Sequence, residues 1–225
     1  MYKLFLVIIL ISPLLFSCIN LGSNETEVIV ELTEEEKVTS IYQEALEALE
    51  EGDAFYAGKK FREVETLLPQ SEWAAKASLM SAYSDYARNS YEASVKGFRR
   101  FLKNYPADKN ISYAEYLIAI CFYEQILDEK KDIEPLLRAK KQFEYVIKKY
   151  PETDYAIGSK FKIDLIIDQL AAKEMYIARY YMENQKWIPA LNRLKTVVDK
   201  YDKTIFIEEA LHRLVEVYYK IGLIE

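Results

Sequence analysis

One histidine and two cysteines are the residues of this 225-residue chain best suited to acid–base, nucleophilic or metal chemistry. His212 lies three residues after Glu209 in a charged segment, a spacing that places neighbours on a helix surface. Cys121 lies within AEYLIAICFYEQI, where a small buried hydrophobic residue is expected. A catalytic triad or a zinc site brings several such groups together. The sequence therefore predicts no enzyme active site, no metal and no cofactor.

Cys18 ends an apolar run that begins at Leu4, behind a short basic start with Lys3. Cys18 has three possible interpretations: half of a disulfide, part of a membrane span, or the processing site of an export signal. Two cysteines give no disulfide framework. The apolar run is interrupted by Pro13 and is shorter than the roughly 20 residues of a membrane-spanning helix. A short apolar run behind a basic start is typical of an export signal.

The residues before Cys18 indicate which kind of signal this is. In LFSC, Leu15 stands three residues before the cysteine and the small Ser17 directly before it, which resembles the lipobox of bacterial lipoproteins. We expect residues 1–17 to be a lipoprotein signal peptide and residues 18–32 a flexible tether with an acylated Cys18; the alternative is a plain signal peptide with an incidental cysteine. Each buried CH₂ of the acyl chains contributes about 0.8 kcal/mol, so the tether would anchor the protein. Ile19 favours the outer membrane, because an aspartate there would favour retention at the inner membrane.

Aromatic residues are the other candidates for a function, since the chain has 19 tyrosines. Two groups stand out in the sequence: Trp73, Tyr83 and Tyr86, and then Tyr180, Tyr181 and Trp187. Tyrosine and tryptophan combine a large apolar body with a polar tip, which suits the binding of an extended peptide or a partner protein. Packing inside a helical repeat is the alternative, and the sequence leaves both open.

A repeat with unequal spacing predicts the helices that must position these residues. A small residue is followed four positions later by a large apolar residue and eight positions after that by a residue that ends a helix: Ala57, Phe61, Pro69; Ser94, Phe98, Pro106; Ala139, Phe143, Pro151; Ala190, Leu194, Asp202. Residues four apart share one face of a helix, and proline blocks its continuation. This register predicts the second helices of four tetratricopeptide helix pairs.

The first helices of the pairs are expected at 33–51, 71–89, 111–128, 155–184 and 205–222. The fourth would be about 45 Å long at 1.5 Å per residue, with an apolar stripe at Phe161, Leu165, Ile166, Leu170, Met175, Ala178 and Met182. The fifth is not followed by a second helix in the sequence. We therefore expect an all-α, tetratricopeptide-like solenoid over residues 33–225, with about five helix pairs and the last one incomplete.

The overall charge of the chain indicates which kinds of partner it can bind. The formal net charge is −6, whereas a nucleic-acid-binding protein needs an excess of lysine and arginine to neutralise phosphates. Acidic runs such as LTEEE and ALEEGD fit the first turn and the solvated end of helices. The sequence therefore predicts no nucleic-acid partner.

Three stretches carry a family resemblance: LLPQSEWAAKASLMSAYSDYARNSYEAS, FRRFLKNYPADKNISYAEYLIAICFYEQI and ARYYMENQKWIPALNRL. Together with the lipobox and the long helix that runs into RYY, they resemble the BamD family, the lipoprotein subunit of the machinery that assembles β-barrel proteins in the bacterial outer membrane. The resemblance covers the chain from about Thr33 to its end. It implies a non-enzymatic scaffold of five repeats, lipid-anchored at the periplasmic face of the outer membrane.

The resemblance also implies two kinds of binding site. The N-terminal repeats would receive the C-terminal targeting strand of unfolded outer membrane β-barrel proteins near Trp73, Tyr83 and Tyr86. The C-terminal repeats would dock the periplasmic domains of a BamA-like barrel protein near Tyr181, Trp187 and Arg193, the last standing where the family has an arginine implicated in that coupling. Other lipoproteins of the machinery are further expected partners. Asp202 departs from the family's pattern, because a proline is expected at the end of the fourth repeat.

Two other functions compete with this one at the level of sequence. A tetratricopeptide coordinator of peptidoglycan or division synthesis, resembling CpoB, would have the same shape, but no N-terminal heptad region is present. A helical lytic transglycosylase would need a separate catalytic domain, and no stretch outside the repeats is long enough for one.

Overall fold

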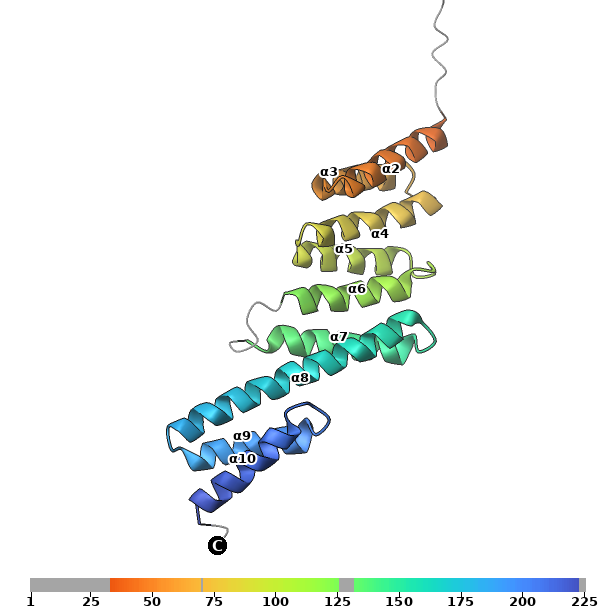
Figure 1. The fold of residues 1–225 in the computed structure, drawn as a ribbon. Coiled ribbons are helices and arrows are strands. Elements are labelled where there is room, and N and C mark those ends of the chain that lie inside the picture. The colour runs from red at the N-terminus through yellow and green to blue at the C-terminus, as the bar shows by residue number, and fades with distance from the viewer. Residues whose placement is uncertain (1–32, 70, 126–131, 223–225) are drawn as a thin grey trace, which may run out of the picture. The chain divides into compact units, whose positions relative to one another are not determined.

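The computed structural model describes residues 33–69, 71–125 and 132–222 (Figure 1). Residues 34–225 form one compact unit, separate from the residues before it. The predicted signal peptide, the tether and Cys18 lie outside the described residues, and the predictions about them remain predictions. All helices of the described residues belong to the compact unit.

The described part of the compact unit is built of α-helices alone, which confirms the predicted fold class. Figure 1 shows these helices following one another as a ladder, and each packs mainly on its neighbours in the chain. Four pairs are complete and α10 begins a fifth. The helices are α2 (Glu34–Glu50), α3 (Ala54–Leu67), α4 (Glu72–Ala87), α5 (Tyr91–Asn104), α6 (Ile111–Glu124), α7 (Glu134–Lys149), α8 (Asp154–Glu183), α9 (Trp187–Lys200) and α10 (Ile207–Lys220).

The second helices of the four pairs end where the register predicts. Each stops two residues before its helix-ending residue: at Leu67, Asn104, Lys149 and Lys200. The residue in between donates its backbone N–H to a carbonyl four residues back and so closes the last turn. Asp202 ends α9 at the same position as the three prolines end theirs, so the fourth repeat keeps the register without proline.

The turns from first to second helices are also alike. In the three such turns that the structure describes, one residue adopts a left-handed conformation: Gly52, Asn89 and Gln185, with φ of 90°, 60° and 57°. The next residue then donates its N–H to the carbonyl five positions back, over 2.8 Å in all three turns. This hydrogen bond satisfies a carbonyl at the end of the first helix and reverses the chain.

The small and large residues of the register fill the interior. All eight are fully buried: Ala57, Phe61, Ser94, Phe98, Ala139, Phe143, Ala190 and Leu194. The small member allows the partner helix to approach closely. The crossing of α4 and α5 is close as well. Gly97 of α5 faces Ala82 of α4 there, and a Cβ on the glycine would lie 2.8 Å from the Ala82 Cβ.

The long helix α8 has the predicted length of about 30 residues, and it joins two cores. Ile166 and Leu170 pack with α6 and α7 in one core, while Met175 and Ala178 pack with α9 and α10 in the next. The prediction that Phe161 belongs to the same apolar stripe is wrong, because its side chain is 64% exposed. Phe161 lies five positions before Ile166. At 3.6 residues per turn, five positions rotate a side chain by about 140°, which turns Phe161 away from the buried face.

Two single-residue predictions are confirmed. Cys121 is fully buried and its thiol donates to the Ser94 hydroxyl at 3.4 Å. Burial raises the pKa of this thiol to about 11, which suppresses thiolate chemistry. The His212 side chain is 74% exposed, and the carboxylate that it approaches is that of Glu216 at 3.7 Å, rather than that of Glu209.

None of the helices of the described residues is long and apolar enough to cross a bilayer. No group of three or more histidine, cysteine and carboxylate side chains in that part of the chain is placed to hold a metal ion.

Candidate partner-binding surfaces

Trp73 lies in the first turn of α4, which begins at the capping residue Ser71. The Ser71 hydroxyl accepts a hydrogen bond from the Ala74 N–H at 3.1 Å and satisfies one of the free amides of the helix start. The indole packs edge-on against Tyr42 of α2, with 5.1 Å between ring centroids. The Lys76 ammonium lies 5.0 Å from the indole ring. Trp73 is thus half-buried between the first two helix pairs.

Tyr83 and Tyr86 lie at the other end of α4 and pack on a different core from Trp73. Their ring centroids are 5.8 Å apart, and Tyr91 of α5 continues the row at 6.0 Å from Tyr86. Burial raises the pKa of Tyr86, and the nearby Glu124 carboxylate raises it further. The structure therefore brings Tyr83 and Tyr86 together. At 1.5 Å per residue, Trp73 lies about 15 Å from Tyr83 and about 20 Å from Tyr86 along the helix.

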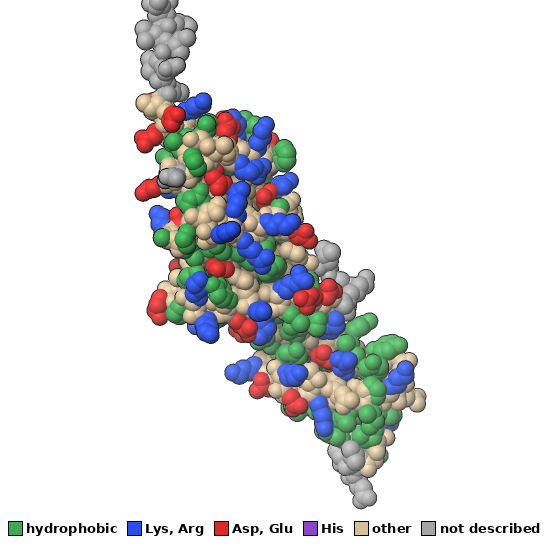
Figure 2. Space-filling model, turned by 180° about the vertical axis from the view of Figure 1, so that it is seen from behind, with side chains coloured by type: hydrophobic (Ala, Val, Ile, Leu, Met, Phe, Trp, Pro, Cys, Tyr) green, Lys and Arg blue, Asp and Glu red, His purple; other side chains and the backbone are tan. Residues whose placement is uncertain are grey.

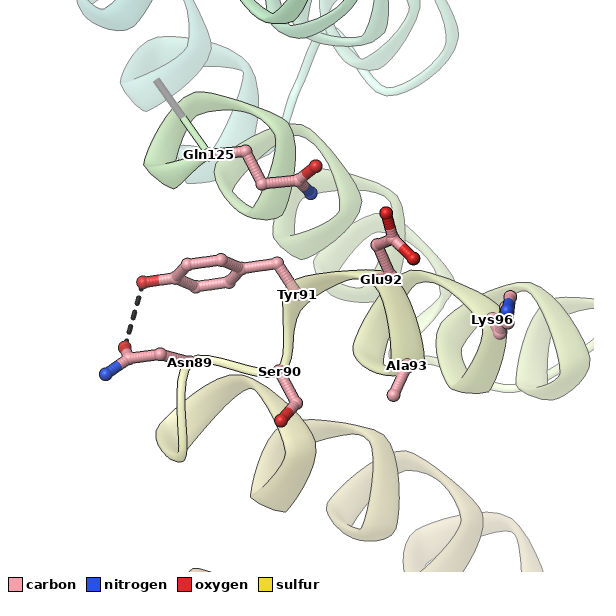
Figure 3. Close-up of a pocket in the computed structure, with 7 residues that line it drawn as sticks. All are labelled: Asn89, Ser90, Tyr91, Glu92, Ala93, Lys96 and Gln125. Atoms are coloured by element: carbon pink, nitrogen blue, oxygen red, sulfur yellow. Dashed lines mark hydrogen bonds between the residues drawn. The ribbon is translucent and has the colours of Figure 1, made fainter. Parts of the chain in front are cut away.

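A hollow of about 510 Å³ opens beside this row (Figure 3). The Tyr91 ring lies between Gln125 at the end of α6 and the turn at Asn89, and its hydroxyl donates to the Asn89 carboxamide oxygen at 2.9 Å. Glu92 and Lys96 of α5 extend the wall of the hollow. An aromatic side with polar groups around it can receive an apolar side chain while the backbone amides of a bound peptide find hydrogen-bond partners.

The tyrosine row continues into the third and fourth pairs, which sequence reasoning missed. Tyr113 and Tyr116 of α6 both stack near Tyr155 of α8, with centroids 5.4 and 5.6 Å apart. Burial raises the pKa of Tyr113 to about 12, with smaller contributions from the surrounding tyrosines, Tyr83 first among them. The spacing of Tyr113 and Tyr116 on one helix face was the signal in the sequence, but their meeting with Tyr155 depends on how α6 and α8 pack.

At the other end of the domain, Tyr181 and Trp187 flank the turn between α8 and α9. Both are half-buried against the last core. A hollow of about 290 Å³ lies beside Trp187 and is also lined by Met182 of α8 and Tyr219 of α10. Tyr180 and Tyr219 are more exposed than the two predicted residues, at 53% and 66%. The exposed aromatic surface here is therefore larger than the sequence indicated.

Arg193 lies on the flank of α9, next to the buried Leu194, and its side chain is 43% exposed. Its guanidinium donates to the Glu174 carboxylate of α8, at 3.1 Å to one oxygen and 3.4 Å to the other. Glu174 is the more buried partner, with 17% of its side chain exposed. Arg193 therefore joins α8 to α9, and it also keeps an accessible edge.

Comparison with known proteins matches this helical unit to one family. A family model described as "Outer membrane lipoprotein" (YfiO) matches residues 34–225, from the first described helix to the end of the chain. The chain belongs to the YfiO family. A tetratricopeptide-like helical fold is the fold of that family, in agreement with the paired helices of this structure.

Relatives within this family share much of the sequence. The chain is 40% identical over 192 residues to the outer membrane protein assembly factor BamD of Caulobacter vibrioides, and 38% identical over 186 residues to that of Rickettsia prowazekii. It is 26% identical over 218 residues to the BamD of Neisseria meningitidis serogroup A. These matches cover 85%, 83% and 92% of the chain.

The relatives are longer than the matched region. The chain spans 63% of the length of the Caulobacter protein, 74% of the Rickettsia protein and 81% of the Neisseria protein. All three names describe an assembly factor, and the family description places the family at the outer membrane as lipoproteins.

Proposed function

We propose that this protein is a non-enzymatic scaffold subunit of the outer membrane β-barrel assembly machinery and takes part in inserting β-barrel proteins into the outer membrane. One observation carries the proposal: the whole helical unit matches the YfiO family, whose members in Caulobacter and Rickettsia are named outer membrane protein assembly factors. A solenoid of helix pairs suits a scaffold, because it offers extended surfaces on which several partners can bind at once.

The N-terminal half is the side proposed to receive unfolded β-barrel proteins. The features that support this are the half-buried Trp73 and Tyr83–Tyr86 pair, together with the hollow beside Tyr91. The C-terminal strand of a barrel protein alternates apolar and polar side chains. Its apolar side chains would pack on the tyrosine rings and in the hollow, whose polar rim would bind the backbone.

This binding can be measured with a synthetic peptide of such a C-terminal strand. We expect a Tyr83→Ala/Tyr86→Ala double variant to bind the peptide at least about tenfold more weakly, since aromatic anchors of this kind often contribute more than about 1 kcal/mol each. Tyr219→Ala, an aromatic truncation at the other end of the domain, is the control and should leave the affinity unchanged. Equal affinity for all three proteins would remove the peptide site from this half.

The C-terminal half is the side proposed to dock the periplasmic domains of a BamA-like barrel protein, with other lipoproteins of the machinery as further partners. Tyr181, Trp187 and Arg193 are the proposed contacts, and the exposed edge of the Arg193 guanidinium would bind a carboxylate of the partner. The Arg193–Glu174 pair complicates a simple substitution, because Arg193→Glu also places two carboxylates opposite each other.

A charge swap separates the two effects. We expect Arg193→Glu to weaken binding of the partner's periplasmic domains by at least about 2 kcal/mol in calorimetric titration, as for other opposed interfacial charges. Adding Glu174→Arg restores the internal ion pair and with it the melting temperature. If Arg193 contacts the partner, this double variant still binds weakly. Full recovery of affinity in the double variant would instead mean that Arg193 acts only by holding α8 and α9 together.

The proposed location is the periplasmic face of the outer membrane, with acylated Cys18 as the lipid anchor. The sequence pattern around Cys18 and the family description support this.

The assembly role itself is tested by isolating the protein from envelopes in mild detergent and identifying the proteins bound to it by mass spectrometry. Recovery of a large outer-membrane barrel with periplasmic domains is expected. Recovery of peptidoglycan synthases without such a barrel would refute the assembly role and favour envelope coordination.

A further inference from the structure

The two helices of the pairs carry opposite charge. The second helices α3, α5, α7 and α9 contain 15 lysines and arginines and 6 aspartates and glutamates. The first helices α2, α4, α6, α8 and α10 contain 8 lysines and arginines and 18 aspartates and glutamates. A protein with a net negative charge therefore has a strongly basic set of second helices.

Much of this positive charge is not neutralised within the described residues. Arg100 of α5 pairs with Glu65, and Arg138 of α7 pairs with Glu134. Lys140 of α7 pairs with Glu144. Six other cations of α5 and α7 contact no carboxylate in that part of the structure: Lys96, Arg99, Lys103, Lys141, Lys148 and Lys149. Figure 2 shows a face of the molecule over which Lys and Arg side chains are spread along the domain, with fewer Asp and Glu between them.

Three of the cations of α5 and α7 surround one open hollow of about 470 Å³. Arg99 of α5 lies on one side, and Arg138 and Lys141 of α7 lie on the other. The half-buried Phe122 of α6 and the Tyr145 ring of α7 complete the lining, together with Gln142. The Gln142 amide is held by the Glu115 carboxylate at 2.7 Å, which fixes its position. The hollow thus has a cationic rim and an aromatic part.

We propose that this hollow and the basic faces of α5 and α7 around it bind the surface of an anionic phospholipid bilayer. The guanidinium and ammonium groups would bind headgroup phosphates. The Tyr145 ring, which is 40% exposed, would lie at the level of the headgroups, where tyrosine is favoured. The description of the chain's family as an outer membrane lipoprotein favours a bilayer as the occupant. The proposal does not depend on the assembly role or on acylation of Cys18.

An acidic protein segment is the other possible occupant, but two features favour the bilayer. The uncompensated cations continue beyond the hollow to Lys96 and Lys103 on α5 and to Lys148 on α7, so the charge forms a broad surface. Attraction to an anionic leaflet adds up over such a surface, because each lysine or arginine within a Debye length of ~10 Å contributes.

The experiment uses residues 18–225, the chain expected after removal of the signal peptide, with Cys18→Ala, so that neither the apolar leader nor an acyl chain masks the contribution of the helices. Partition is measured by co-sedimentation with vesicles of phosphatidylethanolamine and phosphatidylglycerol, and with neutral vesicles of phosphatidylcholine. The test variant is Arg99→Gln/Arg138→Gln/Lys141→Gln. The matched control is Lys37→Gln/Lys160→Gln/Lys220→Gln, which removes the same charge from exposed lysines of first helices.

We expect the test variant to lose at least about tenfold in partition onto anionic vesicles, since three surface cations are removed. The matched control should stay within about twofold of the parent chain, and partition onto neutral vesicles should be equal for all three proteins. Melting curves should coincide, because the substituted side chains are exposed. Equal losses in test and control variants would reduce the effect to net charge and overturn the proposal. An unchanged partition of the test variant would also overturn it and leave an acidic protein segment as the occupant.

Discussion

Phe143→Ala is the substitution that most directly tests the register of the helix pairs. Phe143 is fully buried in α7 and packs with Ile120 of α6 and with Ile166 and Leu170 of α8. Burial of a phenylalanine side chain contributes about 1.5–3 kcal/mol, and the cavity left between three helices adds to this loss. We expect the free energy of unfolding to fall by about 3–5 kcal/mol.

The assay is urea unfolding followed by circular dichroism, with hydrogen exchange to locate the effect. The control is Phe161→Ala in α8, the same substitution at a side chain that is 64% exposed, for which we expect a change of no more than about 0.5 kcal/mol. Because repeats contact mainly their neighbours, amide protection in the Phe143 variant should fall most in α6, α7 and α8. Equal stabilities of the two variants would refute the reasoning, since they would mean that burial at the register position adds nothing.

Three further predictions follow from the sequence and the structure. Cys18→Ala should release the protein from membranes into a high-salt wash without changing its circular dichroism; retention of the variant would contradict acylation as the anchor. Gly97→Ala should lower the melting temperature, because overpacking against Ala82 costs about 1–3 kcal/mol and exceeds the roughly 1 kcal/mol gained in helix propensity; an unchanged melting temperature would show that α4 and α5 separate freely. The pKa of Tyr113 is raised from 10.0 to about 12 and that of Cys121 from 9.0 to about 11. Because the unfolded chain loses these two protons at lower pH than the folded protein does, the free energy of unfolding should fall as pH rises from about 9 to 12. Alkaline unfolding of a Tyr113→Phe variant should begin at higher pH, and an identical profile would contradict this.

The helix pairs were predictable from sequence because their determinants are local. A small residue and a large one four positions apart define one face of one helix, and a proline or an aspartate at a fixed distance ends it. Phe61, Phe98 and Phe143 are buried as these spacings require. The long helix α8 was predictable for the same reason, since its length depends only on the absence of a break between Asp154 and Glu183.

The binding surfaces were only partly predictable, because an aromatic residue in a sequence does not reveal which helix it will meet. Trp73 and Tyr83 lie on one helix, yet Trp73 packs with Tyr42 in one core and Tyr83 packs in the next. The stacking of Tyr113 on Tyr155 depends on two helices whose rings meet across 42 positions of the chain. No spacing within either helix carries that information.

The sequence by itself determined which segments become helices, where the second helices of the pairs end and that the register residues turn inward, because these depend on contacts within about four residues. Tertiary structure alone decided what lies between helices. It placed Arg193 of α9 against Glu174 of α8. It also gathered Arg99 of α5 and Lys141 of α7 around one hollow. The physical reason is that the relative rotation and spacing of packed helices depend on how all their side chains fit together, which no single segment specifies.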